Sequence, residues 1–464
     1  MSSESKWITL FFLTCSWVIW NQWASFFFWL TSTGAVANTT MFSDFLNLYG
    51  NGKWWLAGAY VDPVTRVFSY PFAYPPTSLP IFGFFALFDF AFAVKLWIAM
   101  SLIAFIIAFL ALLLVVNPKS RYLFASISCL LILTSYPLQT ELKLGQINLL
   151  ICSLTALSLV CQRLQHRFAS AALLAMGTLL KGPPILFLVY FVGFRRDLTY
   201  LAHFLISCLA FFGLTLLVVP IQLYWYWLVN VFPSLFVGSG GTINESVLSP
   251  LSMWGFASFT PIILLTGVCL YATFAFCVNS RRFKRVQQSP LTADSLFLMN
   301  TLVLLLLGSR SWPQDYIWVI LPAALMLSGL IVEDAHLVYF VPIAAATFLT
   351  NFDTYPLFPY YLNLPITMIP TGLLGSLVMF FALALYCFRH TIMLSNHQSG
   401  VKGTWGQTLS HFVWRIIPTR YHRLVLQGHY LRSRSLQATK SFKRAFQLSP
   451  SHPPAYAWNS RHDS

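Results

Sequence analysis

The sequence predicts an all-α, polytopic integral membrane protein with about 11–13 transmembrane helices and long loops on one face. Three observations lead to this fold class. Only 9% of the 464 residues are charged and 57% are hydrophobic, whereas about 25% of residues are charged in soluble domains. Apolar runs close to membrane length recur along the chain. Aromatic residues make up 17%, which suits helices whose ends meet lipid headgroups.

A membrane-spanning helix needs about 20 apolar residues, and each predicted span is an apolar run near that length. The first run has no small-residue cleavage pattern after it, so we interpret it as a retained helix and not as a signal peptide. The predicted spans are residues 7–30, 91–116, 122–138, 147–162, 168–180, 183–194, 198–220, 258–279, 293–308, 316–332, 336–350 and 367–388.

The stretch 168–194 has two interpretations, because one tilted span and a tight hairpin around Lys181-Gly182-Pro183-Pro184 both fit its hydropathy. Cytoplasmic loops are enriched in Lys and Arg. The hairpin places 22 of the 28 basic residues on the cytoplasmic side and five on the other. A single span turns the basic cluster at 281–285 outward, so the hairpin is the preferred prediction.

The net charge of +15 comes from short loops and from the C-terminal region, which holds 11 of the 28 Lys and Arg residues after position 388. This distribution indicates membrane topology and no nucleic-acid partner. The eight Cys residues lie in apolar runs without paired spacing, so neither a disulfide framework nor a metal site is predicted.

The composition predicts two domains, a membrane domain at 1–390 and a basic cytoplasmic tail at 391–464. Within the tail, Ala438, Phe442, Ala445 and Pro450 have the spacing of the second helix of a tetratricopeptide repeat. The preferred alternative is a basic amphipathic helix that lies on anionic lipid.

With this topology the outer loops are 31–78, 139–146, 221–257, 309–315 and 351–366, and polar chemistry is expected there. Asp44 follows the first span closely; it is either a solvated loop charge or a base in a partly desolvated cleft. Lys181 interrupts an apolar stretch, where it either snorkels to the interface or pairs with a counter-charge or a phosphate.

Other outer segments combine polar and aromatic residues. The run Tyr70 to Pro76 is stiffened by its prolines, and Gly145-Gln146-Ile147-Asn148 opens a helix beside Glu141. Asn244-Glu245-Ser246 adds amide and hydroxyl groups, and the loop from Ser309 to Tyr316 contains a cation, an acid and aromatic rings.

These segments, in this order, resemble the signatures of glycosyltransferase family 87. The matching residues are Asp44-Phe45, Tyr74-Pro75-Pro76, Gly145-Gln146-Ile147-Asn148, Lys181-Gly182-Pro183-Pro184, Asn244-Glu245-Ser246 and Ser311-Trp312. The family comprises polyprenyl-phosphate-sugar-dependent mannosyl- and arabinofuranosyltransferases with the GT-C fold.

The resemblance implies a plasma (inner) membrane transferase that uses no metal or other cofactor and acts on the extracytoplasmic side. It implies a polyprenyl-phosphate sugar as donor, mannose being favoured, and a glycan or glycolipid as acceptor, with inversion. Family members commonly place a His pair after Ser-Trp, whereas Gln314 and Asp315 stand here, so no histidine role carries over. The implied roles are catalysis for Asp44, with Asp315 in reserve; donor-phosphate binding for Lys181, Gln146, Asn148 and Arg310; and acceptor or sugar binding for Tyr74, Asn244 and Trp312.

Two functions from other classes compete with the transferase. A lipid or glycolipid transporter would show internal repeats and broken helices in corresponding positions, and the sequence contains no such repeat. A non-catalytic membrane assembly subunit is the other alternative, and it stays open because the His pair is absent. The membrane lipids themselves are the remaining expected partner.

Overall fold

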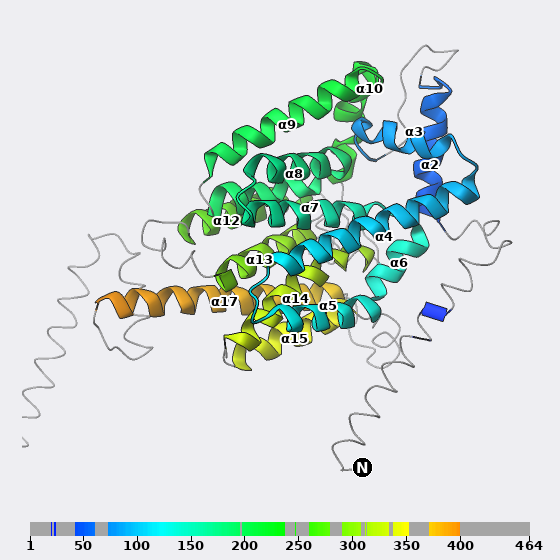
Figure 1. Ribbon diagram of the computed structural model, residues 1–464. Helices are drawn as coiled ribbons and strands as arrows, with labels where there is room; N and C mark the ends of the chain where they lie inside the picture. The colour runs from blue at the N-terminus through cyan, green and yellow to red at the C-terminus, as the bar shows by residue number, and fades with distance from the viewer. Residues whose placement is uncertain are drawn as a thin grey trace, which may run out of the picture. The chain divides into compact units, whose positions relative to one another are not determined.

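In the computed structural model of the chain, every regular element among the described residues is a helix (Figure 1). Contacts divide the chain into two units, Met1–Thr391 and Ile392–Ser464. The described residues are 20, 23–24, 42–60, 73–194, 197–236, 246, 259–278, 290–307, 311, 313–333, 337–351 and 371–399. Residues 400–464 therefore lie outside them, so the amphipathic-helix and tetratricopeptide interpretations of the tail stay predictions.

Helical structure covers each predicted span from residue 91 onward, and the span at 7–30 lies almost wholly outside the described residues. The helices of the long apolar segments are α4 (Phe90–Val115), α5 (Arg121–Leu133), α7 (Asn148–Arg163), α8 (Arg167–Lys181), η3 (Pro183–Leu186), η4 (Val189–Phe194), α9 (Leu198–Leu216), α12 (Thr260–Val278), α13 (Pro290–Leu307), α14 (Ile317–Val332), α15 (Leu337–Asn351) and α17 (Thr371–Ser399).

By length and composition, three helices in the described part of the chain can cross a membrane: Phe90–Val115, Leu198–Leu216 and Gln314–Val332. A fourth span results if α5 and the helix after it count as one. The other apolar helices are shorter. The structure thus agrees with a helical, membrane-embedded protein, and the full number of spans remains a prediction.

The second group of helices lies in the segments predicted as outer loops. The predicted loop at 139–146 was wrong for most of its length, because the chain bends by 54° after α5 and continues as a helix to Leu144. Ser135 accepts a hydrogen bond from Leu138 N–H at 3.0 Å and so starts this helix. The helices that lie in or overlap the loop regions are α2 (Ser43–Leu56), η2 (Pro76–Ser78), α6 (Tyr136–Leu144), α10 (Ile221–Tyr226), η5 (Trp227–Val231), η6 (Pro233–Phe236) and η11 (Pro313–Tyr316). Helix α3 (Leu79–Ala86) lies between the predicted loop at 31–78 and the predicted span at 91–116.

The chain reverses after α8, as the hairpin interpretation predicts. Gly182 ends α8 with φ of +81°, a conformation that favours glycine. Arg167 at the start of α8 forms a 3.3 Å ion pair with Asp197 at the start of α9, and Ser158 lies 3.2 Å from the Tyr200 hydroxyl. Since Arg167 and Asp197 meet, the residues between them leave one end of the helices and return to it. The single tilted span is excluded.

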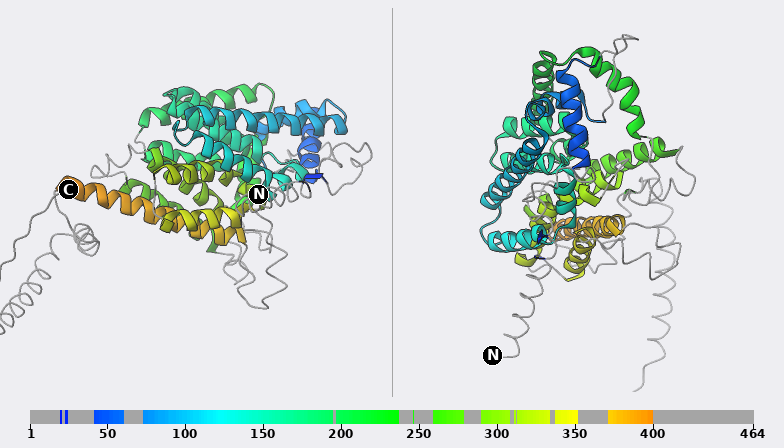
Figure 2. Two further views of the ribbon diagram at one scale, coloured as in Figure 1. Left: turned by 60° about the horizontal axis from the view of Figure 1, so that its bottom comes forward. Right: turned by 90° about the vertical axis from the view of Figure 1, so that its right-hand side faces the viewer.

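Helix α14 lies at the centre of the first unit and α9 at its margin. In the most apolar 18-residue window of each segment, 83% of the residues are buried in Gln314–Val332, which contains α14, and 17% in α9. Helices α5, α7, α13 and α15 surround α14. Helices α4, α7, α8 and α9 lie side by side in this order, and each contacts the next (Figure 1). Helix α17 lies along α15 (Figure 2), and the rings of Tyr339 and Tyr386 are 5.5 Å apart there.

The helices in this unit have two ends, which are named the Arg163 end and the Lys181 end. At the Arg163 end, Arg163 and Asp294 join α7 to α13. At the Lys181 end, α2 contacts α3 and α6, and α6 contacts α7, which follows it in the chain. Of the polar residues singled out in the sequence, Asp44, Gln146, Asn148, Lys181 and Asp315 belong to the described residues and lie at the Lys181 end.

Candidate functional site

Five residues that the sequence analysis selected from distant segments form one hydrogen-bonded chain. Gln146 Nε2 donates to Asp44 Oδ2 at 2.5 Å, and Asn148 Nδ2 donates to Gln146 Oε1 at 2.8 Å. Asn148 Nδ2 also reaches Asp315 Oδ1 at 2.7 Å. Lys181 Nζ donates to Asn148 Oδ1 and, at 3.3 Å, to Asp315 Oδ1. The folded chain therefore connects the two candidate bases to the candidate phosphate-binding Lys.

Asp44 is placed by the attachment of α2 to the end of α6. Phe42 N–H donates to the Lys143 carbonyl at 2.8 Å, just before α2 begins. Gly145 has φ of +68°, and a Cβ at this position would lie 2.6 Å from Cβ of Phe45. Only glycine allows this approach. Trp97 Nε1 donates to the Gly145 carbonyl at 2.9 Å, so the turn that carries Gln146 is held from a third helix.

Glu141 belongs to the cluster although the sequence analysis gave it no role. Its Oε1 accepts Leu149 N–H at 2.9 Å, and its Oε2 accepts Asn148 Nδ2 at 3.1 Å. Its side chain is buried. The signal that could have found it is an acidic residue just before a long apolar run, because an isolated buried carboxyl group needs partners.

Lys181 ends α8, where a cation interacts favourably with the helix dipole. Thr77 Oγ1 donates to the Leu179 carbonyl, which attaches the loop before α3 to this last turn. Asp315 lies in η11, the short helix that leads into α14 and contacts α6. Both side chains are largely enclosed, at 21% exposure for Lys181 and 11% for Asp315.

Tyr74 forms part of the surroundings of the cluster. It is half-buried, and its ring lies 6.5 Å from that of Phe82. Its phenol interacts electrostatically with Lys181, Glu141 and Asp44. Burial raises the pKa of Tyr74 to about 12, so its hydroxyl is protonated at neutral pH and can donate a hydrogen bond.

Three selected residues, Asn244, Arg310 and Trp312, lie outside the described residues, so their assignments stay predictions. Among the described residues, no group of three His, Cys, Asp or Glu side chains is arranged to hold a metal ion. The expectation that the reaction needs no metal remains a prediction.

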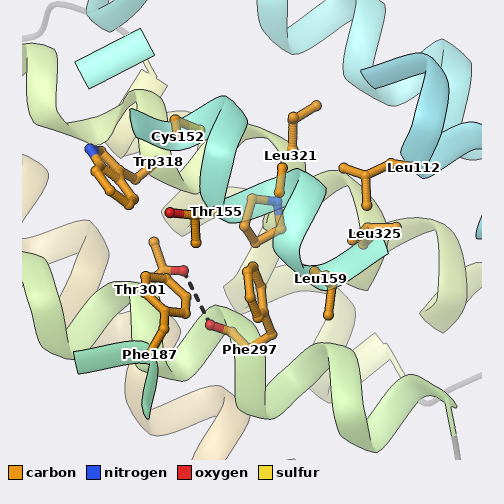
Figure 3. Close-up of a pocket in the computed structure, with 12 residues that line it drawn as sticks. Leu112, Cys152, Thr155, Leu159, Phe187, Phe297, Thr301, Trp318, Leu321 and Leu325 are labelled. Carbon is orange, nitrogen blue, oxygen red and sulfur yellow. Dashed lines mark hydrogen bonds between the residues drawn. The ribbon is translucent and has the colours of Figure 1, made fainter. Parts of the chain in front are cut away.

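An apolar cavity lies deeper in the same helices, between α4, α7, α13 and α14 (Figure 3). Cys152 and Trp318 line it. Cys152 lies about one turn further along α7 than Asn148, and Trp318 lies in α14, which directly follows the short helix that carries Asp315. Its walls are almost entirely carbon, with Thr155 as one of the few polar side chains. It therefore lacks the charged groups that a sugar phosphate requires, and the polar cluster is the better candidate for the site.

The sequence was also compared with known proteins. No curated protein matches the chain. Residues 72–309, just over half of the 464, match the family model of glycosyltransferase family 87. Tyr74, Gln146, Asn148 and Lys181 lie inside this range, whereas Asp44 and Asp315 lie outside it and are tied to it by their hydrogen bonds. The chain therefore belongs to glycosyltransferase family 87 and is a membrane-embedded glycosyltransferase.

Proposed function

We propose that the chain transfers a sugar, mannose being favoured, from a polyprenyl phosphate to a glycan or glycolipid acceptor. The observation that carries this proposal is the continuous hydrogen-bonded chain from Asp44 to Lys181. It places a carboxylate and an ammonium on either side of two amides. Such a site can take a proton from a hydroxyl and hold a leaving phosphate at the same time.

In the proposed reaction, the acceptor hydroxyl attacks the anomeric carbon of the donor from the side opposite the phosphate. Its proton passes to Asp44, the new carbon–oxygen bond forms, and the bond from the anomeric carbon to the phosphate oxygen breaks. The electron pair of that bond leaves with the polyprenyl phosphate, whose added charge Lys181 stabilises. One displacement inverts the anomeric configuration.

Asp44 is a better base than Asp315 in this geometry. A base must reach the substrate hydroxyl, and Asp44 is only partly buried, whereas Asp315 is buried. Asp315 is also engaged by Lys181 and Asn148, which leaves it suited to holding the ammonium in place. It remains the reserve base.

The other side chains receive supporting roles. Gln146 and Asn148 orient the carboxylate and the ammonium around the donor phosphate, to which Arg310 adds a second cation. The hydroxyl of Tyr74 donates to the acceptor or the transferred sugar, together with Asn244 and Trp312. The Lys181 end then faces away from the cytoplasm, because the Arg163 end carries the basic residues that favour the cytoplasmic side.

The test is transfer of radiolabelled sugar from a polyprenyl phosphate to a membrane extract by the purified protein. Asp44→Asn should lower turnover by about a hundredfold or more, the usual contribution of a general base, and leave donor affinity nearly unchanged. Asp89→Asn is the matched control, because Asp89 caps α4 outside the cluster and Asn caps helices equally well.

Three results would contradict the proposal in different ways. If Asp44→Asn keeps near-normal turnover and Asp315→Asn abolishes it, the base is Asp315. If the wild-type protein moves the lipid-linked sugar across vesicles without transferring it, the transporter function is correct; if it does neither, the chain is an assembly subunit.

A further inference from the structure

Helix α7 begins without a capping side chain of its own. The residue before it, Ile147, has no polar side chain, and no side-chain hydrogen bond is made from this position. The first backbone N–H groups of a helix need acceptors. Glu141, from the preceding helix, supplies one by accepting Leu149 N–H at 2.9 Å. A buried acidic residue thus takes the place of an N-cap.

The same carboxyl group helps to fix the orientation of the Asn148 amide. Asn148 Nδ2 faces three oxygen acceptors, on Glu141 at 3.1 Å, Gln146 at 2.8 Å and Asp315 at 2.7 Å. Since the amide nitrogen is surrounded by acceptors, the amide oxygen must point the other way. It accepts the hydrogen bond of Lys181 Nζ. Asn148 itself is fully buried, so it affects the site through the side chains to which it is hydrogen-bonded.

We propose that Glu141 is a positioning residue of the donor site, which acts through Asn148 to hold the Lys181 ammonium where the donor phosphate binds. The proposal rests on the proposed function, because it assigns to Glu141 an effect on phosphate affinity. Both Glu141 oxygens receive N–H donors, one from the Leu149 backbone and one from the Asn148 side chain. The group therefore serves as an acceptor toward α7 and toward Asn148 at once.

Glu141→Gln separates this role from simple capping. The Gln amide is nearly isosteric but has one acceptor and one donor end. If its oxygen caps Leu149, its NH₂ faces Asn148 Nδ2, and two donors then oppose each other. The relaxed arrangement turns the Asn148 amide, so that its NH₂ points at Lys181 and no longer accepts from it. The ammonium then loses its hydrogen bond to Asn148 Oδ1, keeps the one to Asp315 Oδ1 and shifts.

The experiment measures binding of farnesyl phosphate, a short polyprenyl monophosphate, to the purified full-length protein in detergent by calorimetry. Glu141→Gln should weaken binding about tenfold, a typical loss for a hydrogen bond to a charged group. In a Lys181→Met background it should weaken binding no further, since the residue through which Glu141 acts is already absent. Asp294→Asn is the matched control, because it makes the same change in a buried carboxylate at the Arg163 end and should leave binding unchanged.

Three outcomes would each overturn one of the two proposals. Equal losses from Glu141→Gln with and without Lys181 show that Glu141 acts independently of Lys181, and unchanged binding in Glu141→Gln removes its role; either result overturns the inference alone. Unchanged binding in Lys181→Met overturns the proposed function, whatever Glu141 does. If Glu141→Gln does not fold, Asn148→Ala carries the test, with a loss expected in the wild-type background and none in the Lys181→Met background.

Discussion

Removal of the Lys181 ammonium should affect both folding and donor binding, and a second substitution separates the two effects. Lys181→Met keeps most of the side-chain volume but removes the ammonium that lies 3.3 Å from Asp315. Removal of one partner from a fully buried ion pair costs about 3–5 kcal/mol. Lys181 is 21% exposed, and Asp315 keeps its hydrogen bond from Asn148, so we expect a destabilisation of about 2 kcal/mol.

Donor affinity should fall for a different reason. The donor phosphate loses a hydrogen bond from a charged group, worth about 1.5–3 kcal/mol, which corresponds to a loss of roughly 10- to 150-fold. Lys181→Met combined with Asp315→Asn removes both charges of the pair. The free energy of unfolding should return to within about 1 kcal/mol of the wild-type value, whereas donor affinity should stay low.

Two assays on the same samples measure these quantities, chemical unfolding in detergent and the donor KM. If the double variant regains donor affinity together with stability, Lys181 acts only in folding and does not bind the phosphate. If Lys181→Met leaves stability unchanged, the ion pair with Asp315 does not hold the folded protein together as the geometry indicates.

Four further predictions concern other parts of the chain. Gly145→Ala should destabilise the protein by at least about 1–3 kcal/mol in chemical unfolding and lower turnover, because a Cβ strains a backbone with positive φ and contacts Phe45 at 2.6 Å. Tyr74→Phe should raise the acceptor KM several-fold. The folded protein holds the Tyr74 proton more tightly than the unfolded chain does, so the free energy of unfolding should fall as the pH rises from about 10 to 12. In Tyr74→Phe the free energy of unfolding should depend less on pH in that window. Deletion of 401–464 should leave transfer in detergent nearly intact and reduce membrane association in a flotation assay. Single-Cys labelling from outside the cell should reach position 44 and not position 283.

Much of the site could be predicted because its residues interrupt apolar patterns. Lys181 stands out in an apolar stretch, and Asp44 and Asp315 lie next to predicted spans. The hairpin after α8 could also be predicted. Hydropathy fitted both the hairpin and the single span, but the distribution of basic residues favoured the hairpin. The pairing of Arg167 with Asp197 later confirmed the reversal.

Other features could not be predicted, because they depend on contacts between segments. Hydropathy averages over a window and did not register the 54° bend between α5 and α6. The role of Glu141 depends on the orientation of one amide, that of Asn148, which no spacing in the sequence specifies. Asp315 accepts a hydrogen bond from Lys181 although the two residues are 134 positions apart in the sequence. Only the fold brings them together.

The charges of the cluster raise a question about how an anionic donor binds. Its described part holds three carboxyl groups, on Asp44, Glu141 and Asp315, but one ammonium, on Lys181. Asp44 lies in the first turn of α2, and Glu141 accepts a hydrogen bond from the first turn of α7, where the positive end of a helix dipole offsets negative charge. Asp315 instead pairs with Lys181, whose ammonium is the one cation of the described cluster that can attract the phosphate. This arrangement requires polar residues directly before apolar runs, which is where the sequence places Asp315 and Asn148.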